Sequence, residues 1–286
     1  DSSTYDQVYR AMGLDKPIWT QFGLYLNDLL HGNFGNALLT GHPVLDDIRR
    51  VFPATIELAT LAILFGVLIG LPLGVCAASN QGRLGDHVAR VITLFGYSTP
   101  IFWLGMMGLL VFYAWLGWAG GAGRIDLAYD GMVPEVTGLL LIDSSLAGDW
   151  EAFASALRHI VLPALILGLN SVAYISRMTR SFMLEQLSQE YIITARVKGL
   201  SRRQVVWGHA FRNILVQLLT VVALAYGSLL EGAVLIETVF AWPGFGQYLT
   251  SSLMLGDMNA VMGCVLVIGL IFVALNLISD ALYKVF

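Results

Sequence analysis

Long stretches of this sequence contain almost no ionisable side chains. No Asp, Glu, Lys or Arg occurs from Val91 to Gly123, and the stretch from Ala54 to Ala78 contains one, Glu57. A helix needs about 20 apolar residues to cross a hydrocarbon layer roughly 30 Å thick. Soluble domains are about a quarter charged, whereas 13% of these 286 residues are charged and 57% are hydrophobic. We therefore expect the chain to cross a membrane several times.

Apolar segments of membrane length occur in five places. Each is apolar around its whole circumference, as in a membrane span rather than an amphipathic surface helix. The predicted spans cover residues 54–78, 91–118, 160–178, 214–236 and 259–283. The sequence therefore predicts an all-α, polytopic membrane protein.

Three glycines, Gly66, Gly70 and Gly74, recur at every fourth position of the first predicted span. Small residues at this spacing let another helix approach closely. We expect them to form a packing surface.

Basic side chains are concentrated in two connecting segments. Residues 177–212 contain seven Lys or Arg and two acids, and residues 79–90 lie two spans earlier and contain two arginines. Short loops rich in Lys and Arg stay in the cytoplasm. We therefore place both segments in the cytoplasm. Residues 119–159, with six acids, and residues 237–258, without Lys or Arg, are placed outside together with residues 1–53.

An odd number of spans puts the C-terminus in the cytoplasm. A further helix before Asp1 would restore six spans with both termini inside. Residues 1–53 are expected to fold, because Pro17 suits a helix start and apolar residues follow at helical spacing. This segment is either a cap packed on the outer mouth or a docking surface for an extracytoplasmic partner.

Motifs that would carry covalent chemistry are missing. The sequence contains no GxxxxGK[ST] phosphate loop, no HExxH or paired-cysteine zinc motif and no GxSxG nucleophile elbow. Cys76 and Cys264 lie in apolar segments and are expected to be small core residues. We predict no catalytic residue, no metal site and no bound cofactor in this chain, and no nucleic-acid partner.

The segment EYIITARVKGLSRRQVVWGHAFRNI, residues 190–214, has an order that a merely basic loop does not explain. Tyr191 to Lys198 is expected to form a short helix, and Gly199 follows where a helix C-terminus favours a residue that tolerates positive φ. Ser201 then suits the N-cap of a second helix that reaches Arg212. Two short helices joined at a glycine would form a lever between two spans.

This segment resembles the cytoplasmic loop of ABC-importer permeases, whose general pattern is E-A-A, three residues, G, nine residues and I-x-L-P. It is more similar to the dipeptide, oligopeptide and nickel permease family, in which the loop reads nearly Y-I-x-T-A-R-A-K-G-L. The matching residues, with the preceding Glu190, are Tyr191, Ile192, Thr194, Ala195, Arg196, Lys198, Gly199 and Leu200. Further similar segments are GLDKPIW (13–19), PATIEL (53–58), GYSTPIFWLGMM (96–107), RMTRSFMLE (177–185) and ETVFAWPGFG (237–246), so the resemblance covers essentially the whole chain.

The sequence departs from the family pattern at three places. Ile193 replaces the general Glu, residues 209–212 replace I-x-L-P, and Gln217 stands where peptide permeases usually have a proline. The first two departures leave the role of the loop intact. The third is expected to alter how the fourth predicted span begins.

The resemblance implies the type I transmembrane fold of ABC importers and a chain that forms half of a translocation pathway by alternating access. It implies a cap segment (1–53), a permease domain (54–286) and an ATPase-coupling loop (179–213). The implied partners are a second homologous permease, two cytoplasmic ATPases that hold ATP and Mg, an extracytoplasmic substrate-binding protein and the lipid bilayer of the bacterial inner membrane. The implied cargo is a dipeptide or short oligopeptide, most like that of the first permease subunit of dipeptide importers. Nickel chelates, glutathione and haem remain alternative cargoes.

Polar residues inside the predicted spans are candidates for lining the pathway. Pro100 removes a backbone hydrogen bond and is expected to bend the second span. The candidates are Tyr97, Ser98, Thr99, Pro100, Asn170, Ser171, Tyr226 and Glu231. Asn170 and Ser171 equally suit hydrogen bonding between helices, and Glu231 would either attract the amino end of a peptide or neutralise an arginine of a partner subunit.

Residues 237–258 are too short and too interrupted to form a span. The resemblance implies a re-entrant outer gate, and its candidate residues are Phe240, Trp242, Pro243 and Phe245. Two other function classes are less consistent with the sequence. A secondary transporter would be expected to show internal repeats or charged relays, and a membrane-embedded hydrolase would need a nucleophile and a base at membrane depth.

Overall fold

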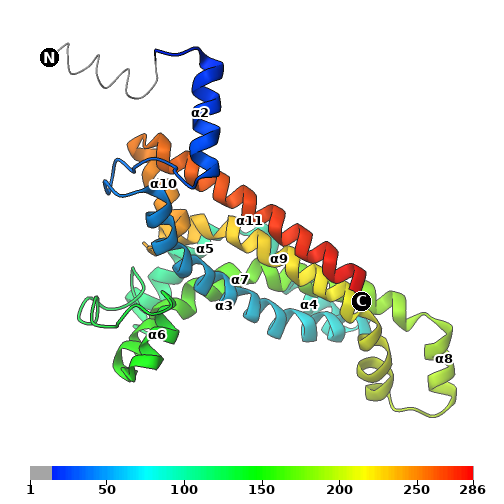
Figure 1. Ribbon diagram of the computed structural model, residues 1–286. Helices are drawn as coiled ribbons and strands as arrows, with labels where there is room; N and C mark the ends of the chain where they lie inside the picture. Colours follow the sequence, from blue (N-terminus) through cyan, green and yellow to red (C-terminus); the bar gives the residue numbers. More distant parts are fainter. Residues whose placement is uncertain (1–14, 286) are drawn as a thin grey trace.

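The computed structural model describes residues 15–285. Most of these residues are helical, and they contain no β-strand beyond one isolated bridge between Asn36 and Pro43. Long helices run side by side between two ends of the molecule (Figure 1). Four described helices are long and apolar enough to cross a membrane, and a fifth candidate is bent. The predicted all-α architecture is confirmed, and the five predicted spans correspond to these four helices and the bent candidate.

The four unbroken spans are longer than their predicted apolar segments. They are α3 (Val44–Ser79), α7 (Trp150–Leu187), α9 (Phe211–Val239) preceded without a break by the π-helical η2 (Gln204–Ala210), and α11 (Met258–Val285). At about 1.5 Å per residue, the 36 residues of α3 and the 38 residues of α7 exceed the thickness of the hydrocarbon layer. These helices therefore extend beyond the membrane and build the ends of the molecule.

The remaining candidate span is broken at a proline. It consists of α4 (Leu84–Ser98) and of α5 (Ile101–Gly108), which continues into the π-helical η1 (Leu109–Trp115), with a bend of 97° between the two parts. Pro100 cannot donate a backbone hydrogen bond and disfavours helical geometry in the residue before it. Thr99 is extended accordingly, at φ −89° and ψ 130°. The predicted bend is confirmed, and at 97° it turns the chain through about a right angle.

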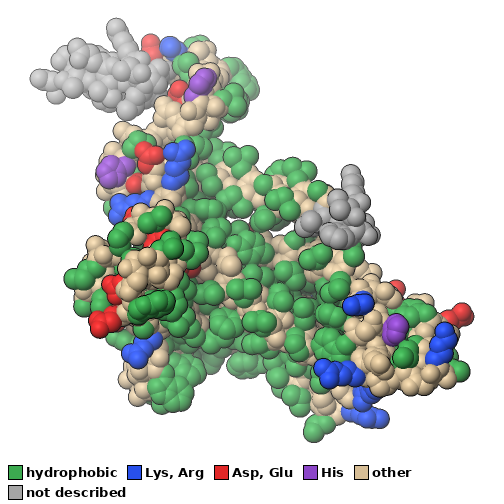
Figure 2. Space-filling model, turned by 60° about the horizontal axis from the view of Figure 1, so that its bottom comes forward, with side chains coloured by type: hydrophobic (Ala, Val, Ile, Leu, Met, Phe, Trp, Pro, Cys, Tyr) green, Lys and Arg blue, Asp and Glu red, His purple; other side chains and the backbone are tan. Residues whose placement is uncertain are grey.

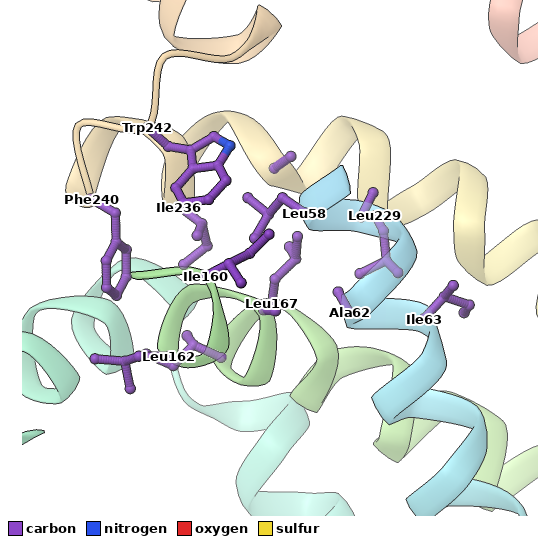
Figure 3. Close-up of a cluster of buried hydrophobic side chains, with 14 of the residues drawn as sticks. Leu58, Ala62, Ile63, Ile160, Leu162, Leu167, Leu229, Ile236, Phe240 and Trp242 are labelled. Carbon is purple, nitrogen blue, oxygen red and sulfur yellow. The ribbon is translucent and has the colours of Figure 1, made fainter. Parts of the chain in front are cut away.

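The main apolar core lies where α3, α7 and α9 meet (Figure 3). The labelled side chains come from all three helices and from the turn after α9, and they are Leu58, Ala62, Ile63, Ile160, Leu162, Leu167, Leu229, Ile236, Phe240 and Trp242. Small residues bring α3 and α7 together. A Cβ added to Gly66 would lie 2.7 Å from the Cβ of Ser171, and one added to Gly74 would lie 2.6 Å from the carbonyl oxygen of Ser176. The predicted packing role of these glycines is confirmed.

Charged side chains gather at the two ends of the molecule, and the surface between them is mainly apolar (Figure 2). We call residues 80–90 and 188–210, with α8 (Glu190–Val197), the basic end. We call residues 15–43, 119–149 and 240–257 the capped end, which contains α2 (Ile18–Leu30), α6 (Leu140–Ala147) and α10 (Phe245–Leu255). The structure therefore groups the connecting segments as their charges predicted.

Two local expectations need correction. Cys264 is buried as expected, but Cys76 is exposed on α3, because it faces away from the seam with α7 that the glycines form. The predicted helix after Pro17 is present as α2, but it stands away from the bundle and buries none of its residues against this chain (Figure 1). Ile18 and Trp19 remain 75% and 81% exposed. The residues before Asp15, which include part of the GLDKPIW match, lie outside the described chain.

Candidate functional site

Helix α8 is held by a small apolar core at the basic end. Its Ile192 and Ala195 are buried at 0% and 6% exposure. They pack in one cluster with Val75 and Ala78 of α3, Met183 of α7, Val205, Val206 and Ala210 of η2, and Ile214 and Leu218 of α9. Helix α8 is therefore packed against the ends of three spans.

Gly199 ends α8 in the left-handed conformation, at φ +80°. The N–H of Leu200 donates to the carbonyl of Ala195 at 3.2 Å, and the N–H of Gly199 donates to the carbonyl of Arg196 at 3.0 Å. This pair of bonds is the Schellman ending that a glycine favours. A Cβ at this position would meet nothing within 4 Å. Gly199 is therefore needed for its backbone conformation, as predicted, and not for close packing.

Ser201 starts the second helix of the loop as predicted. Its N–H and hydroxyl donate to Oε1 of Gln204 at 3.0 and 2.8 Å, and the N–H of Gln204 reaches Oγ of Ser201 at 3.4 Å. This reciprocal arrangement is a capping box. The helix does not end at Arg212, because η2 runs directly into α9. Only the predicted end of this helix at Arg212 was wrong, and Gln217, which replaces the family's proline, leaves α9 free to continue.

The outer face of α8 is uncovered. Tyr191, Ile193 and Val197 are 37%, 56% and 82% exposed. The polar candidates Glu190, Thr194, Arg196 and Lys198 are exposed as well. The hydroxyl of Tyr191 hydrogen-bonds Oε1 of Gln186 at 2.8 Å. The helix therefore presents an apolar strip with charges around it, opposite the side that anchors it in the bundle.

Two groups of hydrogen bonds hold the segments of the basic end to each other and to α7. Neither group was predicted from the sequence. Arg202 donates to the carbonyl of Ser79 and, at 3.0 Å, to Oδ1 of Asn80. Asp86 has 0% side-chain exposure and accepts from Arg180 at 2.8 Å and from Arg90 at 2.8 Å. The spacing of Asp86 and Arg90 at i and i+4 was a readable signal, whereas Arg180 lies 94 residues away.

The predicted lining residues of α4 and α7 divide into two groups. Tyr97 is 67% exposed, and Ser98 and Asn170 are exposed too. Ser171 is buried at the seam against Gly66, which agrees with the alternative of helix contact. The hydroxyl of Thr99 donates to the carbonyl of Phe95 at 2.9 Å. Pro100, at the corner, is exposed.

Arg177 lies between two tyrosines and was not singled out from the sequence as a lining residue. Its guanidinium carbon is 5.4 Å from the ring centre of Tyr97 and 6.0 Å from that of Tyr174. Both distances are within the range of cation–π contacts. The structure thus places a cation next to the predicted lining residue Tyr97.

The candidates on α9 lie on a different part of the bundle. The hydroxyl of Tyr226 is 3.1 Å from that of Thr60 on α3. Glu231 is exposed and borders a small apolar cavity of about 30 Å³ together with Phe52 and Phe272. The contact of Tyr226 with α3 was not predicted from the sequence. The lining role of Tyr226 and Glu231 stays an untested prediction.

Three of the four candidate gate residues are buried. Phe240, Trp242 and Phe245 are 1%, 1% and 4% exposed, whereas Pro243 is exposed. The indole N–H of Trp242 donates to the carbonyl of Ala54 at 3.0 Å. In this chain these aromatics belong to the core, and their predicted gating role remains to be tested.

A buried carboxylate, Glu237, organises this turn, and the sequence reasoning missed it. Its Oε1 accepts from the hydroxyl of Thr55 at 2.5 Å, and its Oε2 accepts from the N–H of Gln247 at 3.0 Å. The hydroxyl of Thr55 in turn accepts from the N–H of Phe245 at 2.8 Å. A Cβ on Gly244 would lie 2.6 Å from the carboxylate of Glu237. The turn is therefore satisfied internally, as irregular backbone near a membrane requires.

An ion pair holds the long loop of the capped end. Arg124 donates to Glu57 at 2.6 Å, and the N–H of Leu141 donates to the same carboxylate at 2.8 Å. In the same loop, burial opposes ionisation of Asp143, but hydrogen bonds from Thr137 and from the backbone of residues 136–138 outweigh it and lower the pKa of Asp143. On α10, burial and then the nearby Asp47 carboxylate raise the pKa of the Tyr248 phenol. These contacts make the capped end a folded layer.

No group of His, Cys, Asp and Glu suited to a metal ion occurs in the part of the chain that the structure describes. The arrangement instead offers a docked helix with an uncovered apolar strip, a corner at Pro100 and an exposed polar face on α4 and α7. Those features suit transmission of movement and passage of a solute.

The comparisons with known proteins agree with this geometry. Residues 70–286 match the family described as binding-protein-dependent transport system inner membrane component. The chain is 45% identical over 280 residues, 97% of this chain and 82% of the relative, to the probable D,D-dipeptide transport system permease protein DdpB of Escherichia coli (strain K12). It is 42% identical over 99% of this chain and 84% of the relative to the di/tripeptide transport system permease protein DppB of Pseudomonas aeruginosa (strain UCBPP-PA14).

A solved structure shares the fold. A chain of the MetNI methionine ABC transporter, in a crystal form with inward-facing conformations, superposes with a TM-score of 0.56 at 18% identity, covering 80% of this chain and 93% of that chain. The transmembrane fold of ABC importers expected from the sequence is thereby confirmed. The family match and the close relatives together establish that this chain belongs to the binding-protein-dependent transport system inner membrane components, in the branch of dipeptide permeases.

Proposed function

We propose that this chain is the permease subunit of an ATP-driven importer and forms half of the pathway by which dipeptides or short oligopeptides cross the bacterial inner membrane. The observation that carries the proposal is the geometry of α8. One side of this helix is buried among the ends of α3, α7 and α9, and the other side exposes Ile193 and Val197. A helix of this kind takes force from a cytoplasmic partner and passes it to the spans.

The peptide cargo is supported by relatives of 40–45% identity whose names give dipeptides or tripeptides as cargo. In the proposed cycle, a binding protein delivers the peptide to the capped end, and two ATPase subunits close on ATP and Mg at the basic end. The coupling loops then move this chain and a second, homologous permease between outward-open and inward-open states. Hydrolysis in the ATPases resets the pair, so this chain performs no covalent step.

The test uses the complete transporter, purified with both permeases and its ATPases and reconstituted in vesicles with its binding protein. ATP-dependent uptake of a labelled dipeptide is expected. Ile193→Asp puts a charge on the exposed strip of α8, and we expect it to remove most ATPase subunits from the purified complex. Leu127→Asp is the matched control, because Leu127 is 91% exposed at the capped end.

Normal co-purification and uptake in the Ile193→Asp variant would contradict the coupling role of α8. Uptake of a nickel chelate, glutathione or haem in place of the dipeptide would keep the importer and change its cargo. Uptake that persists without ATP would indicate a secondary transporter instead.

A further inference from the structure

A polar cleft opens between α4 and α7 on the basic side of the bundle. It has a volume of about 510 Å³, and its polar lining includes Arg90 and Thr93 of α4 and Arg177, Arg180 and Ser181 of α7. Three arginines and one aspartate, Asp86, leave the cleft with a formal charge of +2. A small anion would be attracted there.

The three arginines of the cleft differ in the hydrogen bonds and ion pairs that they make within the chain. Arg90 and Arg180 both donate to the buried carboxylate of Asp86. Arg177 makes no hydrogen bond or ion pair with any residue that the structure describes, and it is exposed between the rings of Tyr97 and Tyr174. Its five N–H donors are therefore free for a ligand, while the rings restrict where the guanidinium points.

The cleft continues a polar stripe along the two helices. Asn170, Tyr174, Arg177 and Ser181 follow each other at helical spacings of four, three and four on α7, and Arg90, Thr93 and Tyr97 do so on α4. Asn170, two turns before Arg177, is exposed and hydrogen-bonded to no other described residue. A side chain of this polarity is costly against hydrocarbon. The stripe therefore faces water or protein, and the cleft is the part of it that lies nearest α8.

We propose that Arg177 binds the carboxylate end of the peptide as it leaves the pathway toward the basic end. This inference rests on the proposed function, and it adds the group of the cargo that is recognised and the residue that recognises it. A guanidinium matches a carboxylate with two parallel hydrogen bonds. Arg180 and Arg90 contribute positive potential, and Asp86 keeps them in place beside Arg177.

An anionic lipid headgroup is the competing occupant, because basic pockets between spans also bind such headgroups. The structure favours the cargo because the polar stripe runs from the cleft up to Asn170 in the predicted span 160–178, beyond the level of a headgroup. A lipid site would end at the interface. We therefore assign the cleft to the transported solute and make the lipid an outcome of the test.

The test compares two cargoes in the reconstituted transporter: a labelled dipeptide and the same dipeptide with its C-terminus amidated. The binding protein has its own preference between them, but that preference is the same for every permease variant and cancels in a ratio of ratios. We expect Arg177→Met to lower the ratio of acid uptake to amide uptake about tenfold relative to the wild type, since a charged hydrogen bond is lost. Arg177→Lys keeps the positive charge and should give an intermediate ratio.

Arg83→Met is the control, because Arg83 is exposed at the same end but does not line the cleft. Its ratio should equal that of the wild type. All variants are measured in zwitterionic vesicles and in vesicles with anionic lipid, and the expected loss is the same in both. Co-purification of the ATPases verifies that each variant assembles.

Four results would overturn the inference. An unchanged acid-to-amide ratio in Arg177→Met would show that the carboxylate is not recognised by Arg177. An equal loss of both cargoes would indicate a structural role, and a loss confined to anionic vesicles would assign the cleft to lipid. Absence of ATP-dependent dipeptide uptake in the wild type is a different failure, because it overturns the proposed function and removes the basis of the inference with it.

Discussion

Each end of the bundle contains a carboxylate with 0% exposure, Glu237 at one and Asp86 at the other, and different kinds of donor hold the two. At the capped end, Glu237 accepts hydrogen bonds from the hydroxyl of Thr55 at 2.5 Å and from the N–H of Gln247 at 3.0 Å, both uncharged donors. The side chains around it, including Trp242 and Phe245, are almost fully buried. The turn after α9 is thus closed by hydrogen bonds from uncharged donors inside a packed core, while the ion pair of Arg124 and Glu57 holds the neighbouring loop.

At the basic end, Asp86 is equally buried but is held by two guanidinium groups, those of Arg180 and Arg90. The arginines themselves remain 24% and 57% exposed and border an open cleft. The difference indicates that the capped end holds its shape, whereas the basic end keeps charge available to water, solute or a partner. The predictions below test that contrast, starting with the largest expected effect.

Removing the carboxylate of the capped end should be the most damaging change. Glu237→Ala leaves the N–H of Gln247 without its acceptor and opens a void, and we expect a loss of about 3 kcal/mol in the free energy of unfolding. Thermal unfolding of the purified complex measures it. Glu231→Ala is the control, because Glu231 is exposed on the same helix and pairs with no other described residue. Similar melting temperatures for both variants would contradict the anchoring role of Glu237.

Replacing each acid by its amide separates charge from hydrogen bonding. Glu237→Gln keeps an acceptor among neutral donors and should cost roughly 1 kcal/mol. Asp86→Asn points a donor at Arg180 or Arg90 and leaves their positive charges uncompensated. The loss of a counter-ion from two guanidinium groups costs more than the exchange of one acceptor among uncharged donors, so the fall in melting temperature should be larger for Asp86→Asn than for Glu237→Gln. Equal falls, or a larger fall for Glu237→Gln, would remove the distinction between the two ends.

The features that sequence reasoning predicted have local causes. The spans follow from uncharged stretches, the corner follows from Pro100, and the ending of α8 follows from Gly199. Each is decided by a few neighbouring residues and their interaction with lipid or with their own backbone. The family resemblance then supplied the relation between these pieces.

The features that were missed join residues far apart in the sequence. Thr55 and Glu237 are 182 residues apart, and Asp86 and Arg180 are 94 residues apart. Nothing near Glu237 in the sequence says that its donor is Thr55, at the start of the first predicted span. The position of Arg177 beside Tyr97 was missed for the same reason, because this contact exists only once α4 lies against α7.

Substitution of Gly199 should disturb the basic end, because its backbone conformation favours glycine. Gly199→Ala forces a Cβ into the left-handed region at φ +80°, which costs roughly 1–2 kcal/mol, and the loss should appear as fewer peptides imported per ATP hydrolysed. Gly199→Asn should cost less, because Asn tolerates this conformation. Gly208→Ala is the control, because a Cβ there meets nothing within 4 Å and its φ is not positive. Equal coupling in the three variants would show that the ending of α8 is dispensable.

The smallest effect is expected within the basic end itself, between its two arginines. Arg180 is 24% exposed and Arg90 is 57% exposed, although both donate to Asp86 at 2.8 Å. An exposed ion pair contributes little and is screened by salt. Arg90→Met should therefore change the melting temperature of the complex only slightly, and added salt should remove even that change.

Arg180→Met should lower the melting temperature more than Arg90→Met and should do so at high salt as well, because it takes the better-buried partner from Asp86. The pair of variants is matched in size and chemistry, so the difference isolates burial. If Arg90→Met is the more damaging of the two, the carboxylate depends on its i+4 neighbour within α4 rather than on the contact to α7. In that case the ion pairs of Asp86 do not hold α4 against α7. The shape of the cleft beside Arg177 then has to be maintained by apolar packing between these two helices.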